Sequence, residues 1–267
     1  MITRLRDQRG RWLEECADHL ISTRWSRGPV DIVNLVQELG IELSFTPAAE
    51  NERGTGVAEL LSNGAWRIKV KGVSKNHRYL NPRDRFTIAH ELGHILLFKK
   101  FKLAPTSKSD NDYQACEQLC HDFAGRILIP SEYLRDIVAD SPRSLYQQLS
   151  LKSKLLNVSF AAIAHRVSTF VPNIALFFGC EAKNQAQQDV FRVLWCAHSI
   201  SGLQLSSYLH IFPTDAIGSI VFGVLRSSNL KKTPRDVESA DVAAHIRFSG
   251  PRYVLVTMTK VKKDTIR

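Results

Sequence analysis

Two histidines four residues apart, with a glutamate directly after the first, carry the clearest chemical signal in this 267-residue chain. The motif reads H-E-L-G-H and begins at His90. Residues four apart lie on one face of a helix, so His90 and His94 can both reach a single zinc ion at about 2.0–2.1 Å. Glu91 lies one step around the helix, where its carboxylate can take a proton from a metal-activated water. The motif therefore predicts metal-assisted hydrolysis with Glu91 as the general base.

The helix that must carry the motif has its own start and stop signals. Asn81 suits the N-cap, Pro82 the first helical position, and Asp84 the positive end of the helix dipole. Lys99 and Lys100 suit the negative end. The residues around the motif are mostly apolar, and two imidazoles and a carboxylate in a buried helix are costly to desolvate without a metal or partners. This context favours a metal site over a chance occurrence of the motif.

A catalytic zinc site needs a third protein ligand and one open position. A second helix, expected from about residue 112 to 128, offers Glu117, and a glutamate on a following helix completes the His₂Glu arrangement. Glu117 is therefore the predicted third ligand. His121, one turn later, is the chief rival, and a cysteine ligand is a further alternative. Tyr113, one turn before Glu117, is a candidate for stabilising an oxyanion, with an aromatic core or rim residue as the alternative interpretation.

Two segments resemble the ImmA/IrrE family of metallo-endopeptidases. They are R-F-T-I-A-H-E-L-G-H-I-L-L at residues 85–97 and E-Q-L-C-H-D-F-A-G-R-I-L-I-P at residues 117–130. Weaker agreement at residues 29–41 and 157–167 extends the resemblance over residues 25–170. Two motifs that agree together are a more specific signal than either one alone.

The resemblance implies a zincin-like, gluzincin-like domain in which His90, His94 and Glu117 hold zinc and Glu91 is the base. Manganese or iron could occupy the same ligands. Members of this family typically cleave a helix-turn-helix repressor and so switch on stress or mobile-element genes, which makes such a repressor the expected partner. The family usually has Ala-Asn where this chain has Cys120 and His121. His121 could therefore hydrogen-bond a ligand or compete for the metal.

The expected fold class is α+β. A mainly helical zincin-like peptidase domain with a small antiparallel sheet is expected over residues 1–135, and a helix-turn-helix-like segment over residues 136–180. A strand-rich mixed α/β domain, a candidate sensor, is expected over residues 181–267. The dipeptide Asn63-Gly64 lies between two strand-like runs and predicts a hairpin. The later strand-like runs are residues 190–196, 217–225, 244–248 and 253–259.

The net charge of +10 raises nucleic acid or an acidic partner as an alternative. Residues 61–108 carry eleven Lys or Arg against two acidic residues. This stretch is either a solvated basic face or a surface that attracts an acidic peptide or a DNA-bound protein. Residues 145–170 could form a helix-turn-helix, so a DNA-binding regulator is the main rival function, with direct DNA binding expected to be weak. Hydrolysis of a non-peptide amide is a third alternative, although a strand at 66–70 beside the metal helix favours a peptide substrate.

Cysteine content and hydropathy bear on the compartment. The chain has five cysteines and no Cys-x-x-Cys pair, which indicates neither a disulfide framework nor a four-cysteine zinc module. No run approaches the roughly 18 apolar residues that a membrane span needs. We therefore expect a cytoplasmic protein with no membrane partner.

Overall fold

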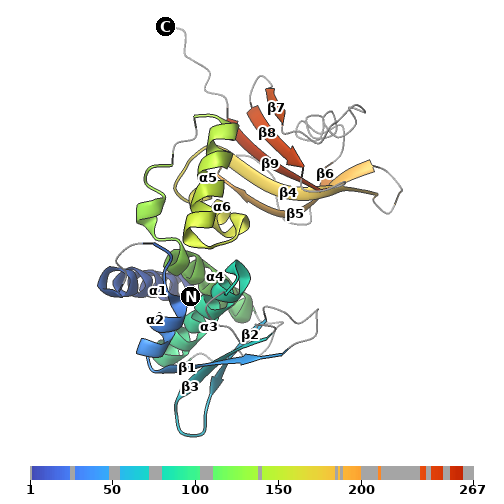
Figure 1. The fold of residues 1–267 in the computed structure, drawn as a ribbon. Helices are drawn as coiled ribbons and strands as arrows, with labels where there is room; N and C mark the ends of the chain where they lie inside the picture. Colours follow the sequence, from blue (N-terminus) through green and yellow to red (C-terminus); the bar gives the residue numbers. More distant parts are fainter. Residues whose placement is uncertain are drawn as a thin grey trace. The chain divides into compact units, whose positions relative to one another are not determined.

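The chain forms two compact units in the computed structural model (Figure 1). The first unit comprises Met1–Tyr133 and Ser153–Ser159, and the second comprises Leu134–Lys152 and Phe160–Arg267. The structure describes residues 2–24, 28–47, 55–71, 80–102, 111–137, 140–183, 186, 189–199, 210–211, 235–238, 242–248 and 253–260. The fold class is α+β, as predicted, because helices and a small sheet precede a strand-rich C-terminal part.

The first unit is built around helix α3, which packs against helix α4 on one side and against a three-stranded sheet on the other. The helices are α1 (Ile2–Arg24), α2 (Ile32–Glu38), α3 (Pro82–Phe101), α4 (Asn111–Leu128) and a short 3-10 turn (Ser131–Tyr133). The strands are β1 (Ile41–Thr46), β2 (Gly56–Leu60) and β3 (Trp66–Lys71). Ile88, Leu92 and Ile95 of α3 are completely buried, so this helix forms the centre of the core.

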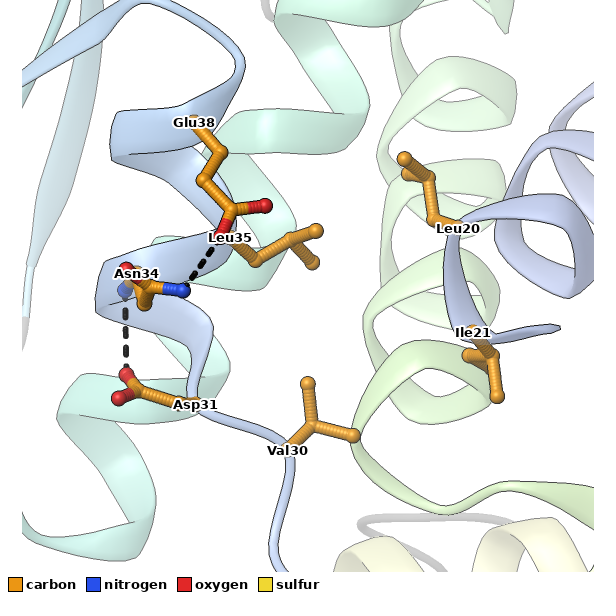
Figure 2. A pocket seen from close by; sticks show the side chains of 7 residues that line it. All are labelled: Leu20, Ile21, Val30, Asp31, Asn34, Leu35 and Glu38. Carbon is orange, nitrogen blue, oxygen red and sulfur yellow. Dashed lines mark hydrogen bonds between the residues drawn. The ribbon is translucent and has the colours of Figure 1, made fainter. Parts of the chain in front are cut away.

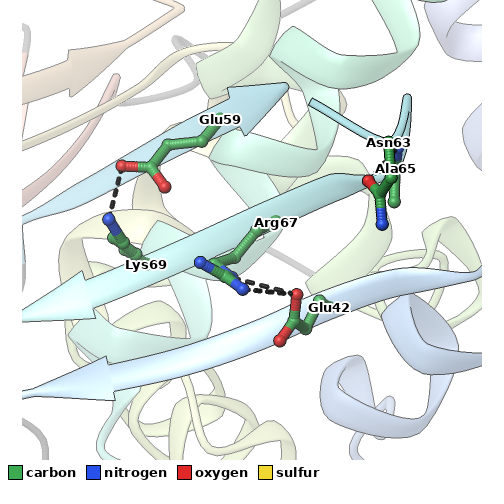
Figure 3. A network of polar contacts seen from close by, with 6 residues as sticks. All are labelled: Glu42, Glu59, Asn63, Ala65, Arg67 and Lys69. Atoms are coloured by element: carbon green, nitrogen blue, oxygen red, sulfur yellow. Dashed lines mark hydrogen bonds and ion pairs between the residues drawn. The ribbon is translucent and has the colours of Figure 1, made fainter. Parts of the chain in front are cut away.

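The small sheet has the strand order β1-β3-β2. Strands β2 and β3 form the predicted hairpin, in which Gly64 has a φ of +81° and Ala65 N donates to Asn63 Oδ1 at 3.0 Å (Figure 3). Strand β1, however, runs parallel to β3, so the sheet is mixed and the expectation of an antiparallel sheet was wrong. The turn signal fixes only the β2–β3 pairing, and nothing in it sets the direction of the strand on the other side of β3.

The two sides of this sheet differ in polarity, as the alternation in β3 predicts. Ile68 and Val70 are completely buried on the side that faces α3, and the Trp66 ring meets the Phe98 ring of α3 edge-on at 5.1 Å. Two basic side chains of β3, Arg67 and Lys69, lie on the outer side. The outer side therefore carries part of the basic stretch seen in the sequence.

Helix α2 is capped and packed by short-range contacts (Figure 2). Asp31 accepts a hydrogen bond from Asn34 N at 3.1 Å, and Asn34 Nδ2 donates to Glu38 at 2.6 Å. A hollow of about 50 Å³ lies among these polar residues and the apolar side chains of α1 and α2, Leu20 and Leu35 among them. It has room for only one or two water molecules, so it is a packing defect rather than a ligand site.

The second unit pairs helices with an antiparallel sheet of strand order β6-β5-β4-β9-β8-β7. Its helices are α6 (Phe160–Ser168) and most of α5 (Pro142–Leu156), and α6 packs on β5. The strands are β4 (Ile174–Lys183), β5 (Asp189–His198), β6 (His210–Ile211), β7 (Arg235–Glu238), β8 (Val242–Phe248) and β9 (Tyr253–Lys260). Aromatic rings connect the helices to the sheet. The ring centroids of Tyr146 and His245 are 5.3 Å apart, and those of Phe160 and Trp195 are 6.4 Å apart.

The strands β5, β8 and β9 confirm three of the strand-like runs, and the run at 217–225 lies outside the described residues. Strand β4 runs through residue 180, where the sequence suggests a boundary. The division into residues 1–135, 136–180 and 181–267 stays a prediction. Among the described residues, no helix combines the length and apolar character that a membrane crossing requires.

Candidate metal centre

The helix that carries the histidines begins and ends as its sequence predicts. Asn81 Oδ1 accepts hydrogen bonds from Arg83 N and Asp84 N, both at 2.9 Å, and Pro82 occupies the first turn. At the other end Lys102 adopts a left-handed conformation with φ of 58°, and its N–H donates to Phe98 O at 2.8 Å. These caps fix the length of α3 and therefore the positions of the side chains along it.

The structure brings His90, His94 and Glu117 together, each with one donor atom within 4.8 Å of the others. His90 Nε2 lies 3.1 Å from His94 Nε2, and the Glu117 carboxylate oxygens lie 3.2 Å and 3.1 Å from these two nitrogens. Three corners of a tetrahedron around zinc, at bond lengths of about 2.0–2.1 Å, are about 3.3–3.4 Å apart. The donor set of two imidazoles and a carboxylate thus fits a divalent metal in both chemistry and spacing.

Burial keeps both imidazoles in the form that binds metal. Burial, together with the neighbouring rings of His94 and His121, lowers the pKa of His90 from 6.5 to about 4. Burial also lowers the pKa of His94, although the charge of Glu117 acts in the opposite direction. A neutral imidazole offers a ring nitrogen lone pair, whereas a protonated ring does not. The side chains remain 12%, 16% and 29% exposed for His90, His94 and Glu117, which leaves the cluster accessible to water.

Glu91 lies against the edge strand β2. Its carboxylate accepts a hydrogen bond from the Ala58 backbone, and burial raises its pKa from 4.5 to about 7, with the charge of Glu117 adding to the rise. Gly56 makes this approach possible, because a Cβ there would lie 2.9 Å from Glu91 Cγ and would collide with Thr87 Cγ2. The strand therefore holds Glu91 beside the cluster of His90, His94 and Glu117.

The other residues singled out from the sequence lie around this cluster rather than in it. His121 is exposed, and its ring lies 4.5 Å from that of His90, but it is not among the three residues whose donor atoms converge. Tyr113 forms a hydrogen bond with Glu117. The pKa of the Tyr113 hydroxyl is raised, chiefly by burial and to a lesser extent by this hydrogen bond. Cys120 is completely buried, and burial raises the pKa of its thiol strongly, which disfavours the thiolate that a metal needs. The predicted roles of His121 and Tyr113 stay predictions.

The contribution of β2 was missed from the sequence. Ala58 acts through its backbone N–H, which no side-chain pattern reveals. Gly56 did carry a signal, because glycine at the start of a strand often marks a close approach of another element. Gly93 lies at a second close contact, because a Cβ there would be 3.3 Å from the Cys120 backbone, where α3 and α4 meet. The tight contacts of α3 with β2 and with α4 thus both depend on a glycine.

Two histidines and a glutamate on adjacent helices form a cluster that could bind a metal, which is consistent with a zincin-like site. The comparison with family models is more particular: residues 65–168 match the peptidase family M78 model, described as the IrrE N-terminal-like domain. This match agrees with the resemblance of the sequence to the ImmA/IrrE family and includes both segments that carry it. The match includes His90, Glu91, His94 and Glu117.

A solved structure shares the fold. A Mycobacterium tuberculosis transcriptional regulator aligns over 95% of this chain and 78% of its own, with a TM-score of 0.53 and 14% sequence identity. At that identity the likeness concerns the fold alone. No curated protein matches the chain.

Proposed function

We propose that this protein is a zinc-dependent endopeptidase that makes a selective cut in a protein substrate, a helix-turn-helix transcriptional repressor. The cut would switch on a stress or mobile-element response in the cytoplasm. The convergence of His90, His94 and Glu117 beside the half-buried carboxylate of Glu91 is the observation that carries the proposal. The M78 family match supports hydrolysis of peptide bonds.

His90, His94 and Glu117 would hold the metal, which is zinc in this proposal, although manganese or iron suits the same donors. When bound, it supplies Lewis-acid activation of a peptide carbonyl and of water. Glu91 has a pKa of about 7, so its carboxylate is partly ionised near neutral pH and can accept the proton of the attacking water. The same group can then deliver that proton to the departing amide nitrogen.

The edge of β2 supports a polypeptide substrate over a small amide. Lys71 N donates to Thr55 O at 2.9 Å, and hydrogen-bonded pairs alternate along an antiparallel ladder. The backbone groups of Gly56, Ala58 and Leu60 therefore point away from β3, along an edge that no described strand covers and at which the Ala58 backbone already bonds Glu91. An extended segment of a protein could pair with this edge and so bring its backbone to the site.

The choice of a repressor as substrate rests on the family and not on the geometry of the site. The similar structure from Mycobacterium tuberculosis is named a transcriptional regulator, which is consistent with a role in gene control. The same name favours the alternative function, a DNA-binding regulator with a structural or vestigial metal site. Against it, the His165 ring lies 6.4 Å from that of Trp195, and the Arg166 guanidinium lies 5.0 Å from the ring of Phe170. The two side chains of α6 best suited to reading bases thus contact this unit's own aromatic rings.

The test combines metal analysis with proteolysis. Protein purified without chelator should contain about one zinc, and repressors encoded beside its gene should be cut once when zinc or manganese is present. Glu91→Gln should keep the metal and cut about 10²–10⁴-fold more slowly. Glu42→Gln, on the outer side of the small sheet, is the matched control and should cut like the wild type. A metal-free wild-type protein, or full activity of Glu91→Gln, would contradict the proposal.

The alternative function is tested on the same Glu91→Gln protein by gel shift. Weak binding to DNA that disappears as salt rises is expected from the net charge of +10. Tight binding to one DNA sequence would favour the regulator.

A further inference from the structure

A hollow of about 400 Å³ opens between the β2–β3 hairpin and the last turn of α3. Its apolar lining includes Leu60, Trp66 and Phe98, and its charged lining consists of Lys99 and Lys102. The Leu60 side chain is 53% exposed, although its neighbours Trp66 and Phe98 are packed edge-on against each other. This hairpin hollow thus has an apolar surface open to solvent beside two ammonium groups.

The hairpin hollow lies in line with the metal centre. Strand β2 starts at Gly56 beside Glu91 and ends at Leu60 in the hollow, a span of about 13 Å at 3.3 Å per residue. Along α3, the seven residues from Glu91 to Phe98 span about 10 Å. A chain extended along the edge of β2 that no described strand covers would therefore reach the hollow about three or four residues from the bond beside Glu91.

The charges of the hollow are not neutralised by the described part of the chain. Lys99 and Lys102 are exposed, and neither forms an ion pair with a described acidic residue. Lys102 Nζ instead lies 6.0 Å from the centre of the Phe98 ring. The basic residues Arg67 and Lys69 of the same sheet, by contrast, each have a glutamate partner. The hollow therefore offers two positive charges to a ligand that brings a carboxylate.

We propose that the hairpin hollow is a substrate subsite for a bulky apolar side chain flanked by Asp or Glu, three or four residues from the cut bond. The apolar side chain would cover Leu60 and Trp66, which removes apolar surface from water. The flanking carboxylate would pair with Lys99 or Lys102, which gives specificity more than affinity. This inference rests on the proposed function, because it takes the edge of β2 as the path of the substrate.

Binding is tested with the full-length Glu91→Gln protein loaded with zinc, because this variant should cut the probe about 10²–10⁴-fold more slowly than the wild type. The probes are two fluorescein-labelled, alanine-rich peptides, one with a central Asp-Phe-Asp and its twin with Lys-Phe-Lys. We expect the acidic peptide to bind about tenfold tighter at low salt, measured by fluorescence anisotropy. Lys99→Glu should abolish that preference. Lys100→Glu, the same charge change one residue along the helix and outside the hollow, should leave it intact.

Three results would overturn the subsite: equal affinity for the two peptides, no measurable binding of the acidic one, or equal effects of Lys99→Glu and Lys100→Glu. The third result would mean that only the overall charge of the helix end matters. Cleavage of a peptide library by the wild-type protein is scored separately. Cleavage with no preference for an acid-flanked apolar residue would reject the subsite and keep the proposed peptidase. A binding preference without any cleavage would reject the peptidase and keep the site.

Discussion

The two sides of the three-stranded sheet place ionisable groups under opposite conditions. On the side of α3, desolvation of the half-buried Glu91 and the nearby charge of Glu117 raise the pKa of Glu91 to about 7, although the hydrogen bond from the Ala58 backbone acts in the opposite direction. On the outer side, Arg67 lies 2.8 Å from Glu42 and Lys69 lies 2.7 Å from Glu59 (Figure 3). These outer pairs are partly exposed, with Glu42 at 53%.

The difference shows why a count of charges does not locate function. The outer ion pairs are partly solvated and join neighbouring strands. Pairs of this kind change the free energy of unfolding only slightly. On the inner side, the carboxylates of Glu91 and Glu117 are partly desolvated and lie close to each other. Two negative charges there are unfavourable unless a metal ion or a proton neutralises one of them. Substitutions on the inner side should therefore have larger effects than those on the outer side.

Removing the two imidazoles should produce the largest effect. Zinc that binds only the folded protein stabilises it by about 4 kcal/mol at a thousandfold excess over its dissociation constant. We expect this gain in the wild type, and its loss when His90 and His94 are both changed to Ala, measured by denaturant unfolding with and without zinc. His121→Ala should retain the gain. If His121→Ala lost the gain while Glu117→Ala kept it, the third ligand would be His121 instead.

The metal-free protein should show the titration of Glu91 in its stability. The folded-state pKa of about 7 lies above the ordinary 4.5 because burial disfavours the charged carboxylate. The neutral group therefore stabilises the fold fully below about pH 4.5, and this contribution is lost as pH rises through 7. Relative to Glu91→Gln, which cannot ionise, the wild type should lose up to about 3 kcal/mol of unfolding free energy between pH 4.5 and 8. A difference between the two proteins that is constant with pH would show that Glu91 is not held in a desolvated state.

On the inner side, the sequence predicted the residues that contribute through their side chains but not the one that contributes through its backbone. The spacing of His90 and His94 and the caps of α3 are local properties, so the sequence contains them in full. Glu117 was reachable because its helix could be predicted and because a His₂Glu site needs an acid there. The hydrogen bond from the Ala58 backbone could not be predicted, because it depends on how strand β2 is placed against a helix far along the chain.

The outer side was predicted less well because cross-strand pairing is not local. The run of basic residues in β3 suggested a basic surface, but the glutamates that neutralise Arg67 and Lys69 come from two other strands. Glu42 could be assigned to Arg67 only once β1 was known to run parallel to β3, and that direction was itself predicted incorrectly. The strand topology therefore determines which basic side chains are paired within the protein and which can bind an acidic partner.

Gly56→Ala should separate the positioning of Glu91 from metal binding. The added Cβ would meet Glu91 Cγ at 2.9 Å and Oε1 at 3.1 Å, so β2 must move away from α3. We expect a loss of about 1–3 kcal/mol in unfolding free energy and about a hundredfold slower peptide hydrolysis, with zinc content unchanged. Val57→Ala is the control, because that side chain is 50% exposed and its loss should change stability by about 0.5 kcal/mol or less. Wild-type activity in Gly56→Ala would mean that β2 does not set the position of the base.

The smallest effect is expected on the outer side. A double-mutant cycle on Glu42 and Arg67, with each changed to Ala, should give a coupling energy of about 0.2–1 kcal/mol, because both side chains are partly exposed. Raising the salt concentration from about 0.01 M to 1 M should shrink it further, since the screening length falls from about 30 Å to 3 Å. A coupling energy above about 2 kcal/mol that resists salt would mean that the outer pairs are as desolvated as Glu91. The two sides of the sheet would then differ only in which charged groups they carry and how these are paired. Burial could no longer explain why the candidate site lies on the side of α3.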